Sequence, residues 1–178
     1  MGLAKEECND PGNTVNSSET VGSLNGERAG GADWLPSIEY NGERKTLFHY
    51  TDEKGMNGIV DSESLYASTG YQHARYGDGQ YFSDIDPNSI QSLTKKGLTP
   101  EQIQNGNMSL STVSSYFYRV PYKTNSISHY VEIDVSDLPI RQGLTENGEQ
   151  LRKHVQLLLN DDKLNLSGRI VSYGKVLK

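Results

Sequence analysis

Gly77-Asp78-Gly79-Gln80-Tyr81-Phe82-Ser83-Asp84 is the stretch of this 178-residue chain that says most about the fold. Its two glycines permit a tight loop, and the aromatic residues that follow favour a short strand over Gln80–Ser83. A phosphate-binding loop is excluded, because that motif needs a Lys followed by Ser or Thr and then a helix. The stretch therefore predicts a glycine-bearing loop that leads into a strand.

Further strands are expected on both sides of this stretch. Ile38-Glu39-Tyr40 and the extended run through Leu47-Phe48-His49 are predicted to form a hairpin, because Asn41-Gly42 between them suits a type I′ turn. Residues 129–135 alternate between two faces, with Val131, Ile133 and Val135 on one, as in a half-buried strand. Shorter candidate strands are 64–66, 116–118, 155–159 and 169–171.

Short helices are expected between the strands. Thr51-Asp52 caps the first helix, and Gly55 and Gly58 within it predict close packing against a neighbour. Asp86-Pro87 begins a second helix that ends at Gly97, with Ile90 and Leu93 facing inward, and Thr99-Pro100 begins a third. Strands interrupted by a few short helices, without a repeated β-α-β unit, predict an α+β fold.

The composition of the chain argues against several classes of protein. Residues 1–33 are mainly small and polar and are expected to form a disordered or loosely attached tail before a domain over 34–178. The net charge is −6, of which residues 1–44 carry −5, so the chain gives no strong nucleic-acid signal. No apolar run is long enough for a membrane span, and no signal peptide is visible. The single cysteine, Cys8, excludes an internal disulfide framework.

Two common kinds of site are not supported by the sequence. The four histidines never fall at the spacing of metal ligands, so no metal is expected; they are His49, His73, His129 and His154. No serine lies in a Gly-x-Ser-x-Gly elbow, which argues against a serine hydrolase of that type.

Three segments in order resemble a known family. Leu47-Phe48-His49-Tyr50-Thr51 is similar to the first conserved strand of the poly(ADP-ribose)-polymerase-like ADP-ribosyltransferases, and residues 77–84 resemble their Gly-x-Gly-x-Tyr-Phe-x-Asp segment. Residues 129–133 and 166–171 extend the likeness to the small toxin-type members named for a His-Tyr-Asp signature. The resemblance implies an ADP-ribosyltransferase-like split β-sandwich, with a few short helices around an NAD cleft.

The resemblance also assigns roles to residues. His49 and Tyr81 match the family's active-site His and Tyr: the Tyr stacks on nicotinamide, and the His donates a hydrogen bond to the adenosine ribose. The backbone at Tyr50 holds the nicotinamide amide. The remaining candidates for binding NAD, which is a substrate here, are Thr51, Arg75, Gly79 and Ser89. For Arg75, a contact to the NAD pyrophosphate and a surface position stay equally open.

The catalytic carboxylate has several candidates. The resemblance implies a carboxylate that holds the nicotinamide ribose and stabilises the positive charge that develops there. Glu132 and Asp134 share one face of one strand; Glu132 is favoured and Asp134 comes next. Asp84 and Asp137 are further candidates. The later strand at 169–171, which by order matches the position of the polymerases' glutamate, carries no acid.

The function implied by the resemblance is mono-ADP-ribosyl transfer from NAD to an unknown acceptor, which can be a protein, a nucleic acid or a small molecule. The toxin-type likeness favours a secreted effector that acts in the cytoplasm of a target cell, although the sequence shows no secretion route. Two alternatives stay open: a non-catalytic module that binds a nucleotide or a protein on a degenerate transferase fold, and an NAD glycohydrolase.

Overall fold

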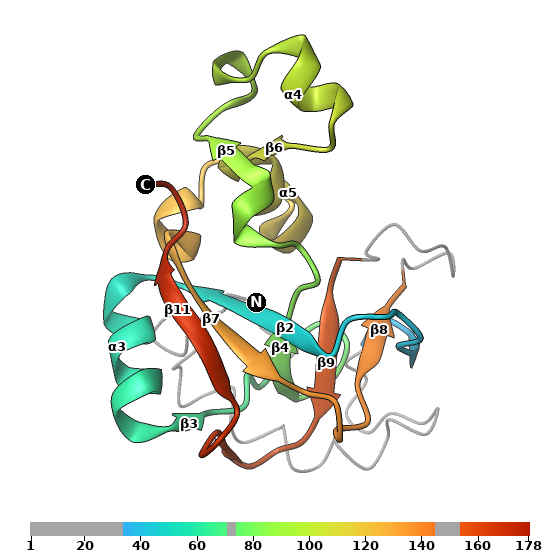
Figure 1. Ribbon diagram of the computed structural model, residues 1–178. Helices are drawn as coiled ribbons and strands as arrows, with labels where there is room; N and C mark the ends of the chain where they lie inside the picture. The colour runs from blue at the N-terminus through green and yellow to red at the C-terminus, as the bar shows by residue number, and fades with distance from the viewer. Residues whose placement is uncertain (1–33, 71–73, 145–153) are drawn as a thin grey trace.

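The computed structural model describes residues 34–70, 74–144 and 154–178 (Figure 1). The predicted tail, residues 1–33, and His73 lie outside the described residues. The strands are β1 (Ser37–Glu39), β2 (Thr46–Thr51), β3 (Ser64–Leu65), β4 (Gly79–Phe82), β5 (Ile90–Ser92), β6 (Met108–Ser109), β7 (His129–Asp134), β8 (Arg141–Gly143), β9 (Gln156–Leu159), β10 (Leu164–Asn165) and β11 (Ile170–Lys175). The α-helices are α3 (Glu53–Ser62), α4 (Pro100–Gln104) and α5 (Leu110–Tyr118), and short 3₁₀ turns are η2 (Pro87–Ser89), η3 (Lys95–Gly97) and η4 (Thr124–Ile127).

Two antiparallel sheets form the body of the protein. One has the strand order β1-β8-β9-β4 and the other has the order β11-β7-β2. They meet at β2 and β4, where Phe48 and Ser83 exchange backbone hydrogen bonds of 2.9 and 2.7 Å. Within the described residues no other backbone pair joins β2 and β4, so the two sheets diverge on either side of the Phe48–Ser83 pair. This is an α+β fold with a split between its two sheets, as expected.

The pattern of β7 explains the inner packing. Val131 and Ile133 are fully buried, whereas Tyr130, Glu132 and Asp134 on the opposite face are only partly buried. Leu47 of β2, Phe82 of β4 and Leu158 of β9 belong to the same apolar cluster as the buried β7 residues. Alternation along β7 thus fixes which face of this sheet points inward.

Helix α3 covers that inner face (Figure 1). Asp52 caps the helix by accepting the Gly55 N–H at 2.7 Å, and Met56 and Ile59 are its buried residues. The predicted cap and the predicted apolar positions are therefore confirmed. A second apolar cluster lies on the other side of the sheets and includes Tyr81, Leu157 and residues of α5.

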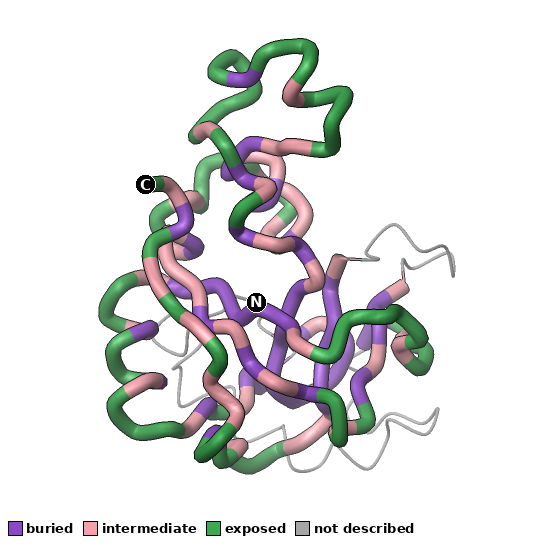
Figure 2. Tube along the Cα trace, in the orientation of Figure 1, coloured by how far each residue is buried: buried purple, intermediate pink, exposed green. Residues whose placement is uncertain are grey.

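The segment from η2 to β6 extends away from the two sheets, and Figure 2 shows that α4 in this extension is largely exposed. Thr99 and Gln102 form a reciprocal capping box that begins α4, as the Thr99-Pro100 signal predicts. β5 and β6 pair in parallel at its base.

The predicted hairpin is wrong. β1 pairs with β8, with Ser37 opposite Gly143, and β2 belongs to the other sheet. The Tyr40 ring packs directly against Gly42, where a Cβ would lie 2.2 Å from the Tyr40 hydroxyl. The chain between β1 and β2 therefore crosses from one sheet to the other instead of turning back on itself.

Three other predictions are corrected. The helix expected from Asp86 to Gly97 is a single turn at η2, after which Ile90 pairs with β6 and Leu93 is exposed. Residues 116–118 end helix α5, because Ser109 caps that helix and its buried residues fall at helical spacing. Gly58 does not mark close packing, since a Cβ there would meet no atom within 4 Å.

Candidate functional site

His49 lies where the two sheets separate. Its Nδ1 is 2.8 Å from the carbonyl oxygen of Tyr81, one strand away across the split. A carbonyl can only accept, so Nδ1 carries the hydrogen, and Nε2 of the neutral ring is left as an acceptor. Burial lowers the pKa of His49 to about 3, so the ring is neutral at physiological pH.

The remaining nitrogen of His49 is an unpaired acceptor inside the protein. Nε2 is buried and has no hydrogen-bond partner among the described residues, and the same is true of the Thr51 hydroxyl. His49 and Thr51 are two positions apart on β2 and therefore project from the same face of the strand. Leaving two such groups unpaired costs about 1–3 kcal/mol each, which a ligand with hydroxyl groups would recover.

The main chain of Tyr50 points into the split. Phe48 directs its backbone N–H and C=O toward β4, and alternate residues of an antiparallel strand direct these groups to the same side. Tyr50 is the next such residue, and the structure gives its N–H and C=O no partner from β4. The Tyr81 carbonyl, which would continue the ladder, accepts instead from the His49 ring. The opening therefore offers one backbone donor and one backbone acceptor beside His49.

Two tyrosine side chains are built into the surrounding core. The Tyr50 hydroxyl donates to the Ile85 carbonyl at 2.6 Å, and burial raises the pKa of Tyr50 well above its usual value. The Tyr81 hydroxyl donates to the Gly77 carbonyl and accepts the Tyr76 N–H, both at 2.8 Å. Its side chain is only 3% exposed. The Tyr81 side chain therefore holds the loop at Tyr76 and Gly77 against β4.

The other predicted NAD-binding residues have partners within the fold. Gly79 exchanges backbone hydrogen bonds with Ser68, and a Cβ on it would lie 1.9 Å from the Leu158 carbonyl oxygen of β9. The Ser89 hydroxyl donates to the Asp86 carbonyl at 2.7 Å. The carbonyl of Arg75 accepts the Leu35 N–H. Close strand packing is thus sufficient to require glycine at position 79.

The structure does not bring Glu132 to His49. On the paired strands β2 and β7, Glu132 is opposite Phe48 and His49 is opposite Val131, so the two side chains lie on opposite faces of the sheet. Hydroxyl groups of Thr46 and Ser172, on the neighbouring strands, donate to the two Glu132 carboxylate oxygens at 2.6 and 2.7 Å. Glu132 links three strands of one sheet, and its geometry does not support the favoured role as the acid beside His49.

The remaining candidate carboxylates lie at strand ends. Asp134 is opposite Thr46, at the end of β2 remote from Thr51, and hydrogen bonds from Ser136 lower its pKa. Asp137 pairs with the Arg169 guanidinium through both oxygens, which lowers the Asp137 pKa. Neither side chain approaches the split.

Asp84 differs from the other carboxylates. It lies two residues after the end of β4, and its carboxylate is 2.9 Å from Nδ1 of His154, which lies two residues before β9. Sequence reasoning considered His154 only as a metal ligand and did not connect it to Asp84. The signal was present: pairing the predicted strands 80–83 and 155–159 in antiparallel register places residues 84 and 154 opposite each other.

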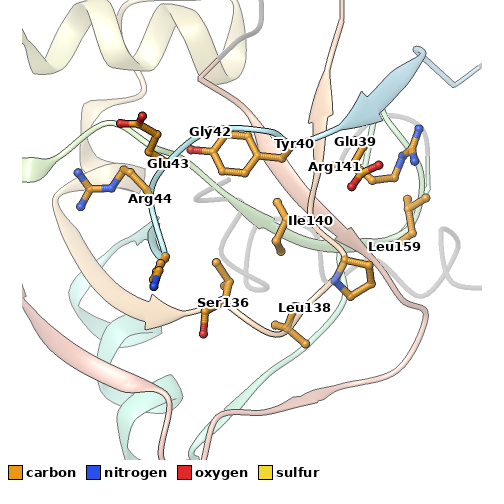
Figure 3. Close-up of a pocket in the computed structure, with 13 residues that line it drawn as sticks. Glu39, Tyr40, Gly42, Glu43, Arg44, Ser136, Leu138, Ile140, Arg141 and Leu159 are labelled. Carbon is orange, nitrogen blue, oxygen red and sulfur yellow. The ribbon is translucent and has the colours of Figure 1, made fainter.

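A separate cavity of about 760 Å³ lies between the β1–β2 connection and the β7–β8 turn (Figure 3). Tyr40, Leu138 and Ile140 line it, with carboxylates and cations from the β1–β2 side and Arg141 from β8. None of the residues that the sequence analysis selects as site candidates lines this cavity. Arg44 at its rim is directed to other partners: it stacks over the Phe48 ring, and its Nε donates to the Thr46 carbonyl at 3.1 Å.

The described residues contain no metal-binding cluster and no membrane-spanning helix. Among residues 34–70, 74–144 and 154–178, no group of three His, Cys, Asp or Glu side chains is arranged to hold a metal ion. No helix in the described segments combines the length and the apolar character needed to cross a membrane.

Comparison with known proteins gives one match. A family model described as "HYD1 signature containing ADP-ribosyltransferase" matches residues 47–170, which is well over half of the chain. The matched range begins in β2 and ends at the start of β11, so it includes both sides of the split. No curated protein matches significantly, and neither does any solved structure.

Proposed function

The chain belongs to the toxin-type family of ADP-ribosyltransferases with the HYD1 signature, and we propose that it binds NAD at the split between β2 and β4 and transfers ADP-ribose from it to an acceptor. The observation that carries this proposal is the pair of buried, unpartnered polar atoms on β2, Nε2 of His49 and Oγ1 of Thr51.

A ribose ring fits this pair of atoms. A ribose hydroxyl donates to Nε2 of His49, and a neighbouring hydroxyl exchanges a hydrogen bond with Thr51. The direction differs from the sequence-based prediction that His49 donates to the ribose, because the Tyr81 carbonyl already takes the one hydrogen of the neutral ring. A carboxamide, which has a donor and an acceptor on one edge, complements the free N–H and C=O of Tyr50 in the same opening.

The Tyr50 main chain and the His49 and Thr51 side chains would therefore bind different parts of one NAD molecule. Pairing of the nicotinamide amide with Tyr50 and of a ribose with His49 and Thr51 would hold the dinucleotide across the split. Cleavage of the nicotinamide–ribose bond releases nicotinamide as a neutral base and leaves an oxocarbenium-like centre open to an acceptor. Positioning the substrate in this way lowers the entropic part of the barrier.

Calorimetric titration with NAD tests the proposal. Thr51→Val keeps the size and branching of the side chain and removes the hydroxyl, so NAD affinity is expected to fall about 3- to 10-fold, as for one lost hydrogen bond. Thr46→Val is the matched control, because Thr46 lies on the other face of the same strand and bonds to Glu132.

The two variants separate the outcomes. Weakened NAD binding by Thr51→Val together with unchanged binding by Thr46→Val supports the site. Equal affinities for both variants and the unmodified chain contradict it. Binding without any cleavage would instead favour a non-catalytic module, and cleavage with water as the only acceptor would favour an NAD glycohydrolase.

A further inference from the structure

Asp84 and His154 form a carboxylate–imidazole pair that the proposed NAD contacts do not use. Their side chains are 24% and 23% exposed, so the pair is partly buried and accessible to solvent. Because Asp84 accepts from Nδ1 at 2.9 Å, the hydrogen of the neutral ring stays on Nδ1 and the lone pair is on Nε2. The structure gives Nε2 of His154 no hydrogen-bond partner among the described residues.

The pair is held by elements on two sides. β4 and β9 pair from Gly79–Leu159 to Phe82–Gln156, and one further step of two residues places Asp84 opposite His154. From α5, the Tyr116 ring packs on the imidazole with centroids 5.2 Å apart and planes at 48°. The ring is therefore fixed by a carboxylate at its Nδ1 and by an aromatic face.

The pair lies beside the junction of β2 and β4, on the face of β2 that carries the Tyr50 side chain; His49 and Thr51 project from the other face, and the opening beside the Tyr50 main chain lies between the strands. Asp84 follows Ser83, which bonds to Phe48 at the junction of the sheets. The next residue, Ile85, accepts the hydroxyl hydrogen of Tyr50 at 2.6 Å. The titratable groups described around the pair are three phenols: Tyr116, which packs on His154, and Tyr40 and Tyr50, whose pKa values are raised by burial and by nearby charges that include Asp84. The Arg44 charge acts on Tyr40 and Tyr50, and the Asp86 charge acts on Tyr50.

We infer that His154 is the general base that deprotonates the acceptor, with Asp84 as the residue that positions it; this rests on the proposed function. The acceptor O–H gives its proton to Nε2 of His154, and its oxygen bonds to C1′ of the nicotinamide ribose. The C1′–N bond breaks, and its electron pair returns to the pyridinium ring, so nicotinamide leaves neutral. The positive charge of NAD ends on the imidazolium, and the step needs no other reactant.

This assignment gives the reaction a proton acceptor, a role distinct from the charge stabilisation expected of Glu132. A carboxylate–imidazole pair takes up a proton as bond formation proceeds, and a positioned base of this kind accelerates a reaction by about 10²–10⁴-fold. His154 is the histidine of the described chain that combines a carboxylate at one nitrogen within 3 Å with partial exposure of the ring.

Nicotinamide release from NAD, with water as the acceptor, provides the test. His154→Gln is expected to lower turnover by about 10²-fold or more and to leave the calorimetric NAD affinity within 2-fold. Asp84→Asn is expected to lower turnover in the same direction by a smaller factor. Asp161→Asn is the control, because it removes an exposed carboxylate in the turn between β9 and β10, and it should leave turnover unchanged.

Two readouts distinguish a base from a structural residue. The turnover of the unmodified chain should fall as acid pH protonates the base, and His154→Gln should lose that dependence. Added imidazole should restore part of the turnover of His154→Ala. If His154→Gln fails to fold, the pH dependence of Asp84→Asn provides the test, with its acid limb shifted relative to the unmodified chain.

The outcomes separate the base assignment from the proposed function. Full turnover of a folded His154→Gln variant, with the unmodified pH dependence, overturns the base assignment and leaves the proposed function intact. Loss of NAD affinity in the same proportion as turnover also overturns it, because the residue then acts in binding. No nicotinamide release by the unmodified chain overturns the proposed function together with the base.

Discussion

Replacement of His49 by asparagine should remove about 2 kcal/mol of the pH dependence of stability between pH 5 and 7. Burial holds the His49 pKa at about 3 in the folded chain, against 6.5 for an unperturbed histidine. Between these values the unfolded chain binds a proton that the folded chain does not. The free energy of unfolding therefore rises as the pH is raised from 3 to 6.5 and becomes level above that range.

The magnitude follows from the size of the pKa difference. Each unit corresponds to 1.36 kcal/mol, so the loss of stability is about 2 kcal/mol at pH 5 and approaches about 5 kcal/mol below pH 3. Asparagine is the suitable replacement, because its amide N–H can still donate to the Tyr81 carbonyl while its side chain does not titrate.

The assay is urea unfolding followed by fluorescence of Trp34, the only tryptophan, at pH 7.5, 6.5, 5.5 and 5.0. The other histidines are present in both proteins, so their contributions cancel in the difference between the two curves. The unmodified chain should lose about 2 kcal/mol more than His49→Asn on going from pH 7.5 to 5.0. Parallel curves would refute the argument that His49 is buried as the neutral ring.

Three further predictions concern the fold. Gly79→Ala should lower the free energy of unfolding by about 1–3 kcal/mol, because a Cβ there would lie 1.9 Å from the Leu158 carbonyl oxygen; an unchanged urea midpoint would contradict the close approach of β4 and β9. Gly58→Ala should stabilise the chain by about 0.5–1 kcal/mol, because α3 is open there, and a lower midpoint would show hidden packing. Asp52→Ala should cost about 1 kcal/mol through loss of the cap to Gly55, and Asp52→Asn should retain most of it in the same measurement.

Sequence patterns predicted the elements whose signals are local. Alternation identified β7 and its inner face, and the cap at Asp52 located the start of α3. The hairpin failed because the partner of β1 is β8, about 100 residues later, and Asn41-Gly42 is equally compatible with a crossing between sheets. Residues 116–118 favour a strand by residue type, but the capping serine and the helical spacing of buried residues determine α5.

The site was predictable only in part for the same reason. That His49 and Thr51 share a face follows from the two-residue period of a strand, which sequence provides. That Nδ1 reaches the Tyr81 carbonyl, and so makes His49 an acceptor toward a ligand, depends on where the sheets diverge. The position of Glu132 on the opposite face depends on the β2–β7 register, which no local pattern encodes.

The central claim is that this chain cleaves NAD held at the split between β2 and β4. The most direct measurement is chromatography of nicotinamide after incubation of the purified, folded chain with NAD, carried out in parallel on Thr51→Val. The account predicts release that continues beyond one nicotinamide per chain and a higher KM for NAD in the variant. A folded chain that releases no nicotinamide, or a Thr51→Val variant with unchanged kinetics, would contradict it.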